Sequence, residues 1–72
     1  MTYNGHKNWA HWNVALWIGN DEGLYRLACD AVKTTTSRKR AALKLVRYLP
    51  ARTPDGARYS IAAVYAALDD WR

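Results

Sequence analysis

The sequence has no phenylalanine, a single cysteine and no long run of apolar residues. One cysteine excludes an internal disulfide and favours a reducing cytosol. No apolar stretch reaches the roughly 18–20 residues that a membrane span requires, so we expect no membrane insertion. The first six residues are mostly polar and predict no signal peptide. A phosphate-binding loop and a glycine-rich nucleotide fingerprint are also absent, which argues against nucleotide chemistry.

The 72 residues, half of them hydrophobic, predict one small domain over residues 1–72. A domain of this size has little room for both a core and a sheltered reaction pocket, so we expect no enzyme, no catalytic residue and no cofactor. A zinc site from His6, His11 and Cys29 is disfavoured because the two histidines lack the i, i+4 spacing of a helical metal pair. We therefore assign no metal ligand.

Hydrophobic periodicity predicts an all-α fold, a compact bundle of about four short helices. A small β element in the termini or in the 50–59 loop is an alternative for the remaining segments. Capping residues precede each helical segment: Asn8, then Asn20 or Asp21, then Ser37 and Ser60. The expected helices span about 9–18, 22–34, 38–49 and 61–71.

The sequence makes two specific predictions for the first helix, on its buried residues and on its end. Trp9, Trp12 and Leu16 form one stripe, and other apolar residues surround the rest of the circumference. A helix that is apolar on most sides is usually central, so the tryptophans, Trp17 included, are expected in the core. Gly19 is expected to end this helix in a left-handed conformation.

The C-terminal half carries two further patterns. A stripe at i, i+3, i+4, i+7 and i+10 predicts the buried face of the last helix, formed by Ile61, Val64, Tyr65, Leu68 and Trp71. The preceding Thr53-Pro54-Asp55-Gly56 predicts a turn, because proline fixes φ and glycine tolerates a positive φ.

Positive charge is concentrated in the second half of the chain. Residues 1–36 contain three basic and three acidic residues, whereas residues 37–72 contain eight basic and three acidic, which accounts for the net charge of +5. Arg40, Lys44 and Arg47 recur at i, i+4 and i+7, so they form a ridge on one helix face. This surface is either a solvated face that keeps a small domain soluble or a site for an acidic partner. The predicted partner-binding residues are Arg38, Arg40, Lys44, Arg47, Tyr48, Arg52 and Arg58.

Two motifs carry a resemblance. The segments NWAHWNVALWI and NDEGLY near the N-terminus, and TPDGARY at residues 53–59, resemble small phage and mobile-element accessory proteins. The chain departs from that pattern at 62–68, which contains no acidic residue, and in its basic third segment. The resemblance implies a counter-defence protein, since some phage proteins of this size are anti-CRISPR inhibitors of type I surveillance complexes.

The leading expectation is therefore a phage-encoded, monomeric or weakly dimeric inhibitor in the host bacterial cytoplasm. It would bind an acidic surface of a CRISPR–Cas effector and block target DNA binding. One alternative is a small basic DNA-binding module or regulator, although its nearly pure Arg/Lys face suits backbone contact better than base reading. A third is a phage structural or assembly factor.

Overall fold

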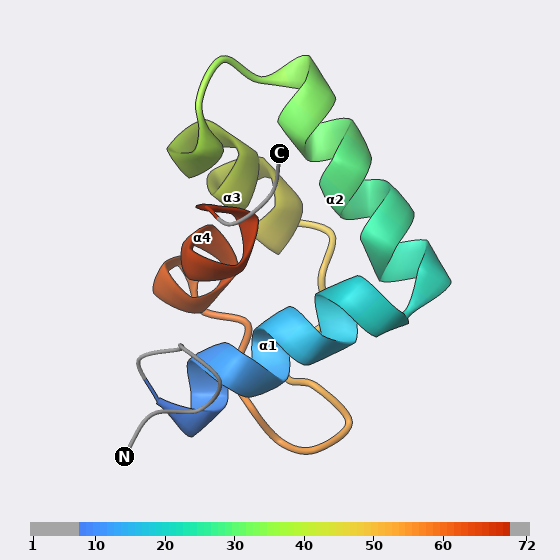
Figure 1. Ribbon diagram of the computed structural model, residues 1–72, viewed down its shortest axis with the longest axis vertical. Helices are drawn as coiled ribbons and strands as arrows, with labels where there is room; N and C mark the ends of the chain where they lie inside the picture. The colour runs from blue at the N-terminus through green and yellow to red at the C-terminus, as the bar shows by residue number, and fades with distance from the viewer. Residues whose placement is uncertain (1–7, 70–72) are drawn as a thin grey trace.

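Four helices form the protein in the computed structural model, which describes residues 8–69. They are α1 (Trp9–Asn20), α2 (Glu22–Thr34), α3 (Arg38–Val46) and α4 (Ile61–Asp69). α1 packs against α2 and α4, and α3 packs against the same two helices, so the four helices close a ring (Figure 1). The expected all-α bundle is confirmed.

Side-chain caps begin all four helices at the expected places. A side-chain oxygen accepts a backbone N–H three residues further on in each case, which satisfies a donor that the first helical turn leaves free. The donor and acceptor residues are His11 to Asn8 (2.9 Å), Leu24 to Asp21 (3.0 Å), Arg40 to Ser37 (3.1 Å) and Ala63 to Ser60 (3.1 Å). Asp21, not Asn20, is the cap of α2.

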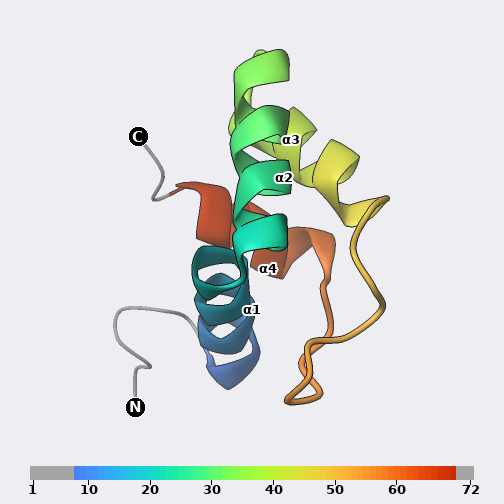
Figure 2. The ribbon, with the colours of Figure 1, turned by 90° about the vertical axis from the view of Figure 1, so that its right-hand side faces the viewer.

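The core differs from the expectation for α1. Val14 and Ile18 are fully buried, while Trp9 is 40% exposed and Trp12 and Trp17 are half-buried. The prediction that the tryptophans form the core is wrong. A helix that is apolar on most sides does not indicate which side is covered, and α1 lies in a ring of four helices, where its neighbours cover only part of its circumference (Figure 2).

The buried face of α4 is also rotated from the predicted stripe. Val64 and Leu68 are buried as expected, but Ile61 and Tyr65 are exposed. Alanines at 63 and 67 complete the buried face instead. Their small side chains allow α1 and α3 to approach closely, and the bulkier residues lie outside. The predicted contribution of Trp71 falls outside the described residues.

Two helix ends differ from expectation. Gly19 lies inside α1 without a positive φ, and the helix ends at Asn20. The next residue, Asp21, has an extended backbone and donates its N–H to Trp17 O at 3.0 Å. α3 ends at Val46, not at Leu49. Residues 47–49 continue as a tighter turn, in which Tyr48 N donates to the carbonyl three residues earlier at 2.9 Å.

The long connection from α3 to α4 passes beside α1 (Figures 1 and 2). It contains the predicted turn, and Gly56 has a φ of 96°, which favours glycine. One antiparallel bridge joins Arg52 to Arg58 and makes the segment a small hairpin. The β element expected in the 50–59 loop is thus reduced to a single bridge, and the one expected at residues 2–7 falls outside the described residues.

Candidate functional site

The basic ridge predicted on the third helix is present. Arg40, Lys44 and Arg47 line one shallow hollow on α3, together with Thr35 and Leu43. No acidic side chain from residues 8–69 lines this hollow. The spacing of i, i+4 and i+7 therefore gathers three cations on one exposed side of the helix, as the sequence indicated.

None of the three ridge cations forms an ion pair with a carboxylate of residues 8–69. The ion pair found in that range lies on α2, between Arg26 and Glu22 at 2.6 Å. Lys44 is tethered differently, since its Nζ donates to Thr34 Oγ1 at 2.7 Å near the C-terminal end of α2. Arg40 and Arg47 form no ion pair with a described carboxylate and remain available to a partner.

Apolar side chains are exposed beside the cations. Leu43 is 45% exposed within the basic hollow, and Tyr48 is 66% exposed one residue after Arg47. Tyr48 also lines a second hollow between α2 and α3, together with Leu27, Asp30, Ala31, Lys44 and Leu45. The α3 face, meaning Arg40, Leu43, Lys44, Arg47 and Tyr48, thus combines cations with an aliphatic and an aromatic side chain.

The other predicted contact residues lie elsewhere. Arg38 begins α3 but is half-buried and already takes part in an interaction. Arg52 and Arg58 are exposed on the hairpin, not on α3. The seven predicted residues therefore do not form one surface: four belong to the α3 face, one is engaged at its start, and two face each other in the loop.

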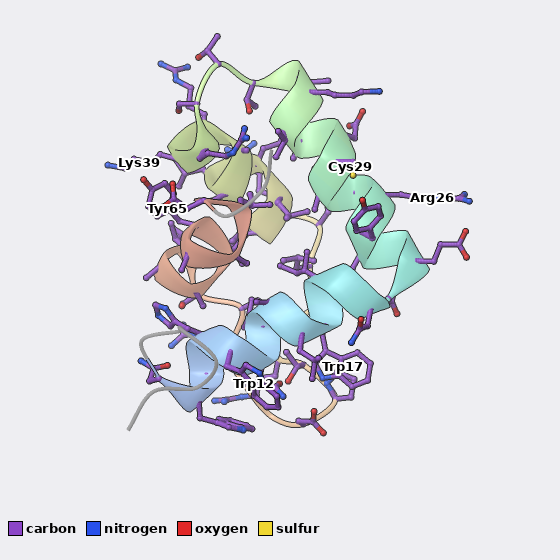
Figure 3. The ribbon with its side chains drawn as sticks, in the orientation of Figure 1. Trp12, Trp17, Arg26, Cys29, Lys39 and Tyr65 are labelled. Carbon is purple, nitrogen blue, oxygen red and sulfur yellow. The ribbon has the colours of Figure 1, made fainter. Side chains whose placement is uncertain are left out.

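A polar network that sequence reasoning missed fixes the hairpin to α1. Asp55 Oδ2 accepts hydrogen bonds from Asn13 Nδ2 and Trp17 Nε1, each at 2.9 Å. Thr53 donates its hydroxyl to Asn13 Oδ1 at 2.6 Å and accepts the N–H of Ala57 at 3.0 Å. Figure 3 shows Trp17 on the side of α1 beside the loop. We call Asn13, Trp17, Thr53 and Asp55 the α1–loop network.

This network joins the two motifs that carried the resemblance. Asn13 and Trp17 belong to NVALW, and Thr53 and Asp55 belong to TPDG. The sequence signal for this network was Asn13, an asparagine among apolar residues of a helix expected in the core, because a buried polar side chain requires hydrogen-bond partners. The two motifs therefore describe one structural unit.

The network also shifts an ionisation equilibrium. The hydrogen bond from Asn13, and next the one from Trp17, lower the pKa of Asp55 below its ordinary 3.8, against a small opposing effect of burial. Nearby, burial raises the pKa of Tyr59, with a further contribution from the Asp21 charge. The buried Tyr59 hydroxyl has no hydrogen-bond partner among the residues that the structure describes.

Other site types find little support within residues 8–69. No three histidine, cysteine or acidic side chains gather there as metal ligands. Cys29 is a free, half-buried thiol on α2. None of the described helices combines the length and the apolar character needed to traverse a bilayer.

Comparison with known proteins finds one matching family model. The model of a family of unknown function, DUF7249, matches residues 1–70. The chain belongs to this family. No curated protein and no solved structure matches it. The DUF7249 description carries no activity, so the function has to be argued from the surfaces described above.

Proposed function

We propose that this DUF7249 protein is a non-enzymatic binding protein whose α3 face docks on an acidic surface of a host protein complex. The observation that carries the proposal is the hollow that Arg40, Lys44 and Arg47 line without an acidic side chain from residues 8–69. Three cations on one face attract an anionic partner and orient it before contact.

The apolar members of the α3 face favour a protein over a nucleic-acid backbone. Leu43 lies among the cations, and Tyr48 flanks them. A phosphate backbone offers positioning contacts to arginine and lysine but no apolar counterpart for a leucine. Protein interfaces, in contrast, bury aromatic and arginine anchors together and gain most of their binding energy from such residues.

The resemblance to phage accessory proteins suggests the biological setting. Within that setting the proposed complex is a type I CRISPR–Cas effector in the bacterial cytoplasm, and binding blocks its access to target DNA. A chain of net charge +5 is not a mimic of the DNA duplex, since mimicry requires negative charge. Inhibition would therefore act through occupation of an acidic protein patch.

A plasmid-interference assay in hosts with type I systems tests this role. The wild-type protein should restore plasmid transformation, and the double variant Arg40→Glu/Arg47→Glu should not. These two arginines are chosen because Lys44 is tied to Thr34 and its loss would also perturb the helix contact. The control Lys33→Glu/Lys39→Glu makes the same change in net charge outside the α3 face and should keep full activity.

Two results would overturn the proposal. The wild-type protein could leave interference unchanged in every type I system tested. Alternatively, the purified protein could bind duplex DNA at micromolar concentration or tighter, with a steep loss on raising the salt concentration and with the same dependence on Arg40 and Arg47. That second result would identify a DNA-binding module.

A further inference from the structure

The hairpin between α3 and α4 places two arginines directly opposite each other. Arg52 and Arg58 form its antiparallel bridge. Two backbone hydrogen bonds flank the bridge, Thr53 N to Ala57 O at 2.7 Å and Tyr59 N to Ala51 O at 3.1 Å. This pattern defines a non-hydrogen-bonded pair, the type of antiparallel pair in which facing side chains come closest.

Burial on the two sides of the hairpin fixes which way this pair faces. Thr53, Ala57 and Tyr59 are buried, whereas Arg52 and Arg58 are exposed, as strand alternation requires. The α1–loop network holds the buried side through Asn13, so a slip in register would break that network. Packing on the opposite side of the hairpin therefore keeps the two arginines on the same exposed face, at directly opposed backbone positions.

Nothing in the described part of the chain balances these two charges. Like charges directly opposite each other on paired strands are destabilising. Arg52 Nη1 donates to Gly56 O at 3.1 Å, which orients its guanidinium over the turn but leaves most of its donors free. Arg58 makes no hydrogen bond or ion pair with residues 8–69. Neither arginine therefore has an ion-paired carboxylate among residues 8–69.

We propose that Arg52 and Arg58 bind one phosphate group, specifically a phosphomonoester dianion. A carboxylate has one negative charge and two oxygens, both of which a single guanidinium fork can engage. A phosphomonoester has three free oxygens and a charge of roughly −1.5 to −2 at neutral pH, which matches two guanidinium groups in both donors and charge. The site lies apart from the α3 face and does not depend on the function proposed for that face.

Titration of the ¹⁵N-labelled protein with O-phospho-L-serine, followed by NMR, tests the site. Amide and guanidinium shifts should centre on residues 51–59. Arg58→Gln should weaken binding by roughly tenfold or more, because each charge-assisted contact contributes a factor of that order. Arg52→Gln should do the same, which guards against a folding defect in one variant. Lys33→Gln on α2, with the same charge change, should bind like the wild type.

Three comparisons can overturn the assignment. Acetate binding as tightly as phosphoserine would show a general anion effect. Dimethyl phosphate binding more tightly than phosphoserine would point to a diester, as in a nucleic-acid backbone. Shifts centred on α3, or binding lost in Arg40→Glu/Arg47→Glu, would place the anion on the other surface. Retained phosphoserine binding in that double variant is the expected result and separates this site from the proposed function.

Discussion

Asn13 is 1% exposed in the middle of α1, and its replacement by alanine tests how the hairpin is held. The substitution removes the acceptor for the Thr53 hydroxyl and one of the two donors to Asp55. Thr53 is buried as well, so its hydroxyl would lose its acceptor in a site that excludes water. The variant should keep its helices and weaken the attachment of residues 51–59 to α1, with Trp17 as the remaining donor to Asp55.

The expected loss follows from the buried part of the network alone. A buried polar group deprived of its partner costs about 1–3 kcal/mol. For a domain of this size each kcal/mol corresponds to about 4–8 °C in Tm, so Asn13→Ala should lower Tm by roughly 5–20 °C. The bond to Asp55 is only part-buried, because Asp55 is exposed, so it adds less to this loss.

Urea denaturation followed by circular dichroism measures the loss in the free energy of unfolding, and thermal denaturation measures the loss in Tm. A double-mutant cycle with Thr53→Ala should show coupling of at least about 0.5 kcal/mol between the two positions, because each variant alone strands the other side chain. Asn20→Ala, at an exposed position of the same helix, is the control. Loss of less than about 0.5 kcal/mol in Asn13→Ala, or additive effects in the cycle, would refute a stabilising role for the network.

Three further outcomes follow from the same region. The pKa of Asp55 is lower in the folded protein, so ionised Asp55 adds to the free energy of unfolding above its ordinary pKa of 3.8. This contribution is lost as pH falls through the folded pKa. Asp55→Asn should therefore flatten the decline of the free energy of unfolding in acid. Tyr59→Phe removes a buried hydroxyl without a partner and should raise the free energy of unfolding by about 1 kcal/mol in a urea titration, whereas a loss of stability would imply a partner. Gly56→Ala should lower the free energy of unfolding by about 1–2 kcal/mol, because Gly56 has a φ of 96°. Gly19→Ala should raise it by roughly 0.5–1 kcal/mol, because Gly19 lies inside α1 with open space at its Cβ. Equal effects at the two glycines would contradict the assigned backbone conformations.

The starts of the helices were largely predictable from the sequence, although both Asn20 and Asp21 were open as the cap of α2 and the helix end predicted at Gly19 was wrong. Asn8, Asp21, Ser37 and Ser60 cap their helices because a capping side chain needs only the next three residues. The positive φ of Gly56 likewise follows from turn chemistry over four residues. Such signals are contained within one turn of chain, so no knowledge of the tertiary arrangement is required.

The buried faces depended on tertiary packing that the sequence does not display. On α1 both the tryptophans and Val14 are apolar, so hydrophobicity alone could not select the covered side. On α4 the alanines at 63 and 67 are buried in place of Ile61 and Tyr65, because close helix approach favours small residues there. Periodicity identifies a helix, but it does not show which of two apolar faces packs against the neighbouring helices.

The candidate sites divide in the same way. The ridge of Arg40, Lys44 and Arg47 follows from helical spacing alone. The pairing of Arg52 with Arg58 depends on the register of a single bridge, which periodicity over so short a segment does not set. Asn13 was the missed signal for that register, since its partner lies 40 residues away.

That separation has a consequence for synthesis on the ribosome. Asn13 is made early, but Thr53, whose hydroxyl donates the buried hydrogen bond to Asn13 Oδ1, is made 40 residues later. At about 5–20 residues per second this interval lasts about 2–8 s. During that time the Asn13 amide must stay hydrated, so the final docking of α1 waits until Thr53 has been made.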